Sequence, residues 1–299
     1  MRRVAHVATL AAGLLAGGTA AHAQYDAYGL ATATGGAQQL VRFNTSNPTA
    51  VTTVGVTGTT LTGIDFRPAT GQLFGFNGTG VYVVDLNTGA ASLVGSGIGA
   101  TVSGNVAFDF NPTVDRIRLV GPSGTNLRLN PITGGVAATD GAYTYAPGDP
   151  RAGATPVFSA AAYTNSVPGT VTSTTLYGID ANFNSLVLIS SPNGGSVSTV
   201  GSLGAALTGT VTGFDIVTVG TTNLAYVVTS GAGAANALYT VDLGTGAATR
   251  MGSIGPANAT IGLQGLAIAT VPEPGTWAML AAGLTGLGAV ARRRRRPAA

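Results

Sequence analysis

The sequence predicts an all-β protein, and more specifically a β-propeller built from repeats. Between residues 24 and 270, no segment shows the apolar periodicity of a helix. Short runs of β-branched and aromatic residues are instead separated by Gly, Asn-Pro and Thr-Gly turns, a pattern typical of many short strands. Three short units also recur at intervals of about 35–70 residues, which is typical of a propeller or another repeat array. The alternative is a β-sandwich of two sheets, which would not require five similar units.

The first recurring unit is a small residue, an apolar residue, an aspartate and a second apolar residue. It occurs at residues 63–66, 107–110 and 213–216, with a looser copy at 178–180. The second unit ends a strand with a Thr-Gly turn, and it occurs at residues 84–91, 241–248 and, more weakly, 129–134. The third unit follows the turn as Val-Gly or Met-Gly, at residues 53–55, 93–95, 199–201 and 251–252.

These units group into five blades. The predicted blades cover residues 25–56, 61–98, 102–145, 157–203 and 210–254. The first blade lacks an opening strand, while residues 263–268 supply an additional copy of it near the other end. We expect this C-terminal strand to complete the first blade, because ring closure removes a free sheet edge.

The N-terminus has the organisation of a secretory signal peptide. Arg2 and Arg3 form a basic start, residues 7–15 are apolar, and Ala21-His22-Ala23 is an A-x-A cleavage site. The apolar segment is too short to cross about 30 Å of hydrocarbon. We therefore expect signal peptidase to cleave after Ala23, which leaves a β-propeller-like domain over residues 24–270.

Residues 271–299 form a C-terminal tail with three successive features. The motif Val271, Pro272, Glu273 and Pro274 is followed by an apolar segment at 276–291 and by five arginines at 292–296. This order resembles the PEP-CTERM sorting tails of Gram-negative bacteria, and the resemblance implies recognition and cutting by an exosortase. The apolar segment is near the short end of the range for a transmembrane helix, and the arginines would stay cytoplasmic. We expect an exported protein, transiently anchored in the inner membrane, at the cell surface or in the extracellular matrix.

The net charge of +3 is a property of the two sorting segments. They contain seven of the arginines and one glutamate, so the remaining body carries a formal charge of −3. The basic isoelectric point is therefore no evidence for a nucleic-acid partner.

The residues that the body lacks exclude most catalytic classes. The chain has no cysteine and no lysine, its only glutamate is Glu273, and both histidines, His6 and His22, lie in the signal peptide. A Ser-His-Asp triad, a Cys-His pair, a Schiff base and a His-ligated zinc site are all impossible. Glycoside hydrolysis by aspartates alone remains open.

The strand units also carry a family resemblance. Residues 61–73, 108–118, 126–131 and 175–180 resemble the bacterial secreted family named domain of unknown function four-three-nine-four. The resemblance spans nearly the whole body, but it implies no established activity, ligand or catalytic residue.

The repeated aspartates are the first candidate site. If the first unit is the innermost strand of each blade, four carboxylates could surround one end of the central channel: Asp65, Asp109, Asp180 and Asp215. Such a ring would suit Ca²⁺, which takes 6–8 oxygen ligands, and no other cofactor is expected. The alternative is that each aspartate accepts hydrogen bonds from backbone N–H groups at its own turn.

Three arginines are the second candidate site. Arg116 and Arg118 share one face of a strand because they are two residues apart, and Arg128 lies on the next strand. Their guanidinium groups could bind a carboxylate of an acidic polysaccharide. The alternative is a cross-strand ladder in which Asp109 and Asp115 pair with these arginines.

Two functions are compatible with these features. The first is a non-enzymatic surface or matrix protein that binds extracellular polysaccharide or another envelope component, in keeping with the sorting tails of biofilm-forming bacteria. The second is an aspartate-based glycoside hydrolase on a propeller, which requires carboxylates about 5–9.5 Å apart in one cleft.

Overall fold

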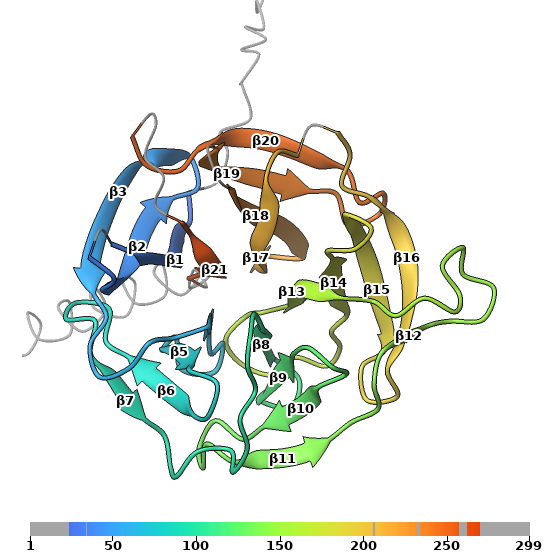
Figure 1. Cartoon of the computed structure of the whole chain (residues 1–299), viewed down its shortest axis with the longest axis horizontal. Coiled ribbons are helices and arrows are strands. Elements are labelled where there is room, and N and C mark those ends of the chain that lie inside the picture. Colours follow the sequence, from blue (N-terminus) through green and yellow to red (C-terminus); the bar gives the residue numbers. More distant parts are fainter. Residues whose placement is uncertain (1–23, 34, 206, 232–233, 257–261, 270–299) are drawn as a thin grey trace, which may run out of the picture.

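The computed structural model is a five-bladed β-propeller, with the blades arranged around a central axis (Figure 1). The structure describes residues 24–33, 35–205, 207–231, 234–256 and 262–269, so the predicted signal peptide and sorting tail lie outside the described residues. Among the described residues, no helix has the length and hydropathy needed to cross a membrane. The prediction of a propeller is confirmed, and the alternative of a sandwich is wrong, because each of the five sheets is a separate blade.

Each blade contains four antiparallel strands, which follow one another in order from the axis outward. Blade one contains β21 (Gln264–Ile268), β1 (Asp26–Thr32), β2 (Gln38–Asn44) and β3 (Asn47–Gly55). Blade two contains β4 (Gly63–Phe66), β5 (Leu73–Phe76), β6 (Val81–Val84) and β7 (Ala91–Leu93). Blade three contains β8 (Ala107–Asn111), β9 (Arg116–Val120), β10 (Asn126–Leu129) and β11 (Val136–Thr139). Blade four contains β13 (Phe158–Tyr163), β14 (Leu176–Asp180), β15 (Ser185–Ser191) and β16 (Ser196–Ser202), and blade five contains β17 (Thr210–Val219), β18 (Thr222–Gly231), β19 (Ala234–Val241) and β20 (Ala248–Ser253).

Two details of the blades differ from the sequence prediction. The short strand β12 (Thr144–Tyr145) was expected at the end of blade three, but it pairs in parallel with β16 and adds a fifth strand to blade four. The looser copy of the aspartate unit at residues 178–180 lies in β14, the second strand of its blade, and not in an innermost strand. The innermost strand of blade four is β13, whose sequence contains no aspartate.

The ring closes through blade one, as predicted. The C-terminal strand β21 pairs with β1, so that Ala27 lies opposite Ile268 and Tyr28 opposite Ala267. Chain segments from both ends of the domain therefore share one sheet (Figure 1). This closure holds the first and last parts of the domain together and pairs the inner edge of β1.

The Thr-Gly turns (the second sequence unit) and the Val-Gly segments (the third) are repeated because a turn of one blade contacts a Val-Gly segment of the blade before it. The Thr-Gly turn of one blade packs against the end of the outer strand in the preceding blade: a Cβ on Gly134 would lie 2.0 Å from the carbonyl oxygen of Val94, and a Cβ on Gly89 would lie 2.0 Å from that of Gly55. Gly89 and Gly134 also have φ angles of 71° and 70°, which disfavour a side chain. Asp85 stabilises its turn by accepting hydrogen bonds from the backbone N–H groups of Asn87 and Thr88.

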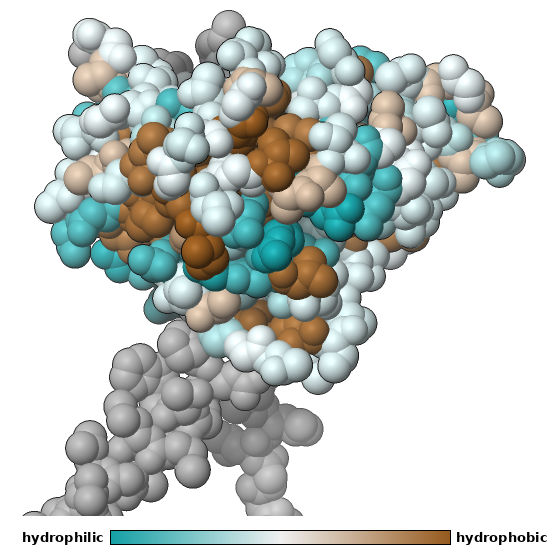
Figure 2. Space-filling view, turned by 90° about the horizontal axis from the view of Figure 1, so that it is seen from below, coloured by the Kyte–Doolittle hydropathy of each residue, from teal (hydrophilic) through white to brown (hydrophobic). Residues whose placement is uncertain are grey.

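The hydrophobic core is divided into clusters that lie between neighbouring blades. One cluster contains Phe74 and Phe76 of blade two and Phe108 and Phe110 of blade three, with the rings of Phe74 and Phe110 in edge-to-face contact at 5.2 Å. The side of the molecule near β7 and β11 mixes apolar and hydrophilic residues (Figure 2). The apolar surfaces of the sheets thus pack against each other around the ring and leave the loops and grooves exposed.

Candidate functional site

The five innermost strands turn one backbone edge toward the central axis. In an antiparallel ladder, alternate residues direct their N–H and C=O groups away from the partner strand. On the axis these groups have no further strand to pair with, and a buried N–H without an acceptor is costly. The aspartates of the first sequence unit supply acceptors for these groups.

Three aspartates accept hydrogen bonds across the boundaries between blades. Asp65 Oδ2 accepts from the backbone N–H of Phe110 in blade three at 2.7 Å, and Asp109 Oδ1 accepts from that of Tyr163 in blade four at 2.9 Å. Asp215 Oδ2 accepts from the N–H of Ile268 in blade one at 2.5 Å. Each aspartate therefore joins its own innermost strand to that of the next blade. The expected role in backbone hydrogen bonding is observed, but all three aspartates bind the next blade, and Asp65 and Asp215 also bind the residue that follows.

At two boundaries the corresponding position is alanine. Ala162 precedes Tyr163 as Asp109 precedes Phe110, and Ala267 precedes Ile268 in the same way. These alanines offer no carboxylate to the next blade. At these two boundaries the backbone N–H of the next blade donates to the aspartate that precedes it in its own strand. Phe66 donates to Asp65 Oδ1, and Ile216 donates to Asp215 Oδ1. The boundaries between blades four and five and between blades one and two are therefore not joined by an aspartate.

The three carboxylates lie so close together that they cannot all be charged without a cation among them. One oxygen of each lies within 4.8 Å of the others, and the three side chains are buried. Burial raises the pKa of Asp65 and Asp109 well above the usual range, and the neighbouring carboxylates raise both further. Burial raises the pKa of Asp215 to about 7. The cluster must therefore hold protons or a cation, and Asp65, Asp109 and Asp215 are the described residues that could ligate one.

Asp180 does not belong to this cluster, so the predicted ring of four carboxylates is wrong in that member. It lies at the end of β14, where it accepts hydrogen bonds from the Tyr145 hydroxyl and from the backbone N–H of Asn182. Its Gly-Ile-Asp sequence resembles the other units, but it lies on the second strand of its blade.

A cavity of about 20 Å³ adjoins the axis and is lined by innermost-strand residues such as Ile64 and Phe108.

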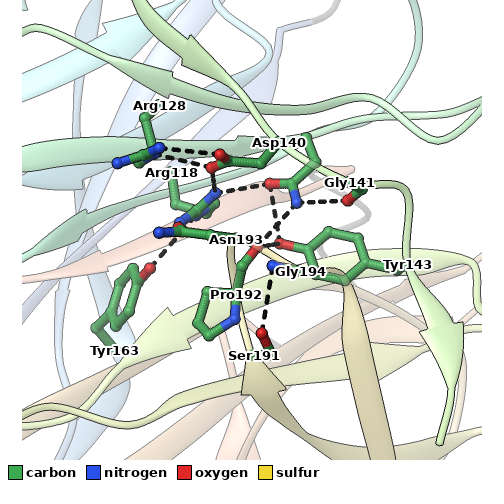
Figure 3. A network of polar contacts seen from close by, with 11 residues as sticks. Arg118, Arg128, Asp140, Gly141, Tyr143, Tyr163, Ser191, Pro192, Asn193 and Gly194 are labelled. Atoms are coloured by element: carbon green, nitrogen blue, oxygen red, sulfur yellow. Dashed lines mark hydrogen bonds and ion pairs between the residues drawn. The ribbon is translucent and has the colours of Figure 1, made fainter.

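The predicted arginine site is occupied by the protein itself (Figure 3). Arg118 and Arg128 lie opposite each other on β9 and β10, and both bind Asp140: Arg118 Nη1 lies 2.6 Å and Arg128 Nε 2.9 Å from its Oδ2. Arg118 also donates to Asn193 at 2.6 Å, so the network joins blades three and four. Burial tends to raise the pKa of Asp140, but hydrogen bonds from the two arginines outweigh it and hold the pKa below the usual value.

The alternative, a cross-strand ladder in which Asp109 and Asp115 pair with these arginines, names the wrong partners. Asp115 binds Arg67 of blade two, and Asp109 lies on the axis. Arg116 donates to the backbone carbonyl groups of Val114 and Asp115. Asp140 accepts hydrogen bonds from both Arg118 and Arg128, and Arg118 is buried, so the protein itself already takes up donors that a ligand would need.

An open groove lies between blades one and two. Its volume is about 380 Å³, within the range of small-ligand sites, and its lining residues come from three strands of blade one and the turn after β6. The polar side chains at its wall include Tyr28, Arg42, Thr52 and Asn87. No short motif in the sequence marks Arg42 or Thr52 as part of a site, since only the register of the folded blade brings Tyr28, Arg42 and Thr52 into one row across the sheet.

The comparisons with known proteins place the chain in a family. A family model described as Domain of unknown function (DUF4394) matches residues 39–267, and a PEP-CTERM protein-sorting motif matches residues 270–296. The chain therefore belongs to the DUF4394 family and carries a signal for export and sorting to the cell surface in Gram-negative bacteria. A search of curated proteins finds no match.

Several solved structures have a low similarity to this chain. An auxiliary nutrient binding protein from Bacteroides thetaiotaomicron VPI-5482 is 15% identical with a TM-score of 0.35, over 58% of this chain and 47% of that one. A proposed 6-phosphogluconolactonase from Bacteroides uniformis ATCC 8492 is 13% identical with a TM-score of 0.39, over 76% and 81% of the two chains. TolB from Acinetobacter baumannii is 14% identical with a TM-score of 0.41, over 77% of this chain and 53% of that one. The chain spans about half the length of the first and third of these proteins. Similarities this low do not indicate a function.

Proposed function

We propose that this protein is a non-enzymatic surface or matrix protein that binds extracellular polysaccharide. The observation that carries the proposal is the open, polar groove of about 380 Å³ between blades one and two. Grooves lined by hydroxyl, amide and guanidinium groups suit sugars, whose hydroxyl groups both donate and accept hydrogen bonds. The sorting motif supports this role because it directs the protein to the surface, where such polymers lie.

The axial aspartates give little support to the alternative of a glycoside hydrolase. One oxygen of each carboxylate lies within 4.8 Å of the others, so the three carboxylates form one cluster and do not face each other across a substrate cleft. The adjoining cavity of about 20 Å³ holds no more than a water molecule and cannot admit a sugar ring. Five of the six carboxylate oxygens also accept backbone hydrogen bonds.

The sorting segments complete the proposal. Signal peptidase would release residues 1–23, and the segment at 276–291 would hold the protein in the inner membrane until an exosortase acts on the tail. The domain over residues 24–270 would then function at the cell surface or in the matrix, bound to polysaccharide or to an envelope protein.

Co-sedimentation with extracellular polysaccharide from the producing strain tests the proposal. The exported protein should bind in a saturable manner and leave the polymer intact, as judged by constant reducing-end content. Failure to bind would overturn the binding role, and release of reducing ends would favour the hydrolase instead. A matched β-propeller protein without the groove serves as the control for non-specific sedimentation.

A further inference from the structure

The boundaries between blades one and two and between blades three and four have equivalent rows of side chains. Across blade three, the register places Asp109, Arg118 and Arg128 opposite one another. Across blade one, it places Ala267, Tyr28 and Arg42 in the corresponding row. Arg42 therefore occupies on β2 the position that Arg128 occupies on β10.

The groove between blades three and four is filled by a carboxylate of the chain itself. Asp140 follows β11 and accepts two hydrogen bonds from Arg128, from Nε to Oδ2 at 2.9 Å and from Nη2 to Oδ1 at 3.0 Å (Figure 3). Asn193 and Tyr143 enclose the same place, and only 6% of the Asp140 side chain is exposed. A bidentate pairing of this kind is the geometry in which a guanidinium recognises a carboxylate.

The equivalent groove between blades one and two has no such carboxylate. Arg42 makes one ion pair, between its Nη2 and Asp26 Oδ2 at 2.7 Å, and 54% of its side chain is exposed. Among the described residues, its Nε and Nη1 have no hydrogen-bond partner, and neither does the Tyr28 hydroxyl. Burial raises the pKa of Tyr28, so the hydroxyl stays protonated and able to donate. Two kinds of donor therefore line an open groove.

We propose that this groove binds a carboxylate of an acidic polysaccharide, with Arg42 pairing a uronate group and the Tyr28 hydroxyl donating beside it. Thr52, opposite Arg42 on β3, and Asn87, in the turn after β6, lie along the same wall and offer hydrogen bonds to the sugar hydroxyls. The proposal rests on the proposed function and names the class of polymer and the side chain that selects it. The ligand carboxylate binds Arg42 as Asp140 binds Arg128, through Nε and Nη2, and it displaces Asp26 from Nη2.

The test compares polygalacturonate with the same polymer after chemical reduction of its carboxyl groups. Wild-type exported protein should bind polygalacturonate and bind the reduced polymer at least about tenfold more weakly, because a charged hydrogen bond contributes about 1.5–3 kcal/mol. Arg42→Gln should lose binding to a similar extent. Arg250→Gln is the matched control, since Arg250 is also an exposed arginine on a strand, and its Nη2 donates to Ser253.

Two further variants address the groove and the competing ion pair. Thr52→Trp should block the groove without changing the charge and should weaken binding to polygalacturonate. Asp26→Asn removes the partner of Arg42 and should strengthen binding, most clearly at low salt. Circular dichroism and thermal unfolding of each variant verify that the fold is intact.

The outcomes separate the inference from the proposed function. Equal binding to native and reduced polymers, or equal losses in Arg42→Gln and Arg250→Gln, would overturn the carboxylate site while leaving a polysaccharide-binding protein. Absence of binding to any polymer, including that of the producing strain, would overturn both.

Discussion

The ion-pair network between blades three and four allows a quantitative prediction. Asp140→Asn keeps the shape of the side chain but removes the only carboxylate among the described residues that forms an ion pair with Arg118. The side chain of Arg118 is 3% exposed, so its charge would remain buried without a counter-ion. Breaking a buried pair in this way costs about 3–5 kcal/mol.

This cost is large for a single domain. For a protein of this size, a loss of 1 kcal/mol lowers the melting temperature by about 2–4 °C, so Asp140→Asn should lower it by about 6–20 °C. The matched control is Asp26→Asn, whose ion pair with Arg42 is exposed on both sides. An exposed pair contributes about 0–1 kcal/mol, and the control should therefore unfold close to the wild type.

Urea-induced unfolding, followed by circular dichroism, measures both variants. We expect a lower midpoint for Asp140→Asn with an unchanged slope, because the surface exposed on unfolding is the same. A free energy of unfolding within about 1 kcal/mol of the control would refute the reasoning, because it would mean that Arg118 is stabilised without its counter-ion.

Two further predictions concern the axis and the turns. Because the pKa of Asp215 is raised to about 7 in the folded state, its contribution to stability should be fully present below about pH 4 and should be lost as the pH rises through 7, with further losses from Asp65 and Asp109. Asp109→Asn should reduce this decrease between pH 5 and 8.5, and Ca²⁺ should leave the melting temperature unchanged; a rise with Ca²⁺ would instead identify a cation in the cluster. Gly134→Ala should destabilise the protein by more than Gly148→Ala, since both positions have a positive φ but only the Cβ at Gly134 would collide with a carbonyl oxygen. Equal costs in thermal unfolding would contradict the proposed contact between the turn and the preceding blade.

The repeats predicted the fold well because they encode contacts between neighbouring blades. The Thr-Gly and Val-Gly units recur because a turn of one blade packs on the outer strand of the blade before it, as Gly134 does on Val94. The closing strand was predictable for the same reason, because residues 264–268 repeat the innermost strand that blade one otherwise lacks.

The candidate site was harder to predict because it depends on exceptions to the repeat. The innermost strand of blade four has Ala162 where three other blades have aspartate, and the next strand happens to carry Gly-Ile-Asp, so local sequence assigned Asp180 to the axis. The partner of Arg118 and Arg128 is Asp140, which only the fold brings beside them. The groove between blades one and two combines three strands and a turn, and no short motif marks it.

A crystal structure of the exported protein with a uronate oligosaccharide tests the central claim most directly. We predict that a sugar carboxylate lies within hydrogen-bonding distance of the Arg42 guanidinium and the Tyr28 hydroxyl, in the groove between blades one and two. A sugar bound elsewhere on the propeller, with Arg42 still paired only to Asp26, would contradict the account.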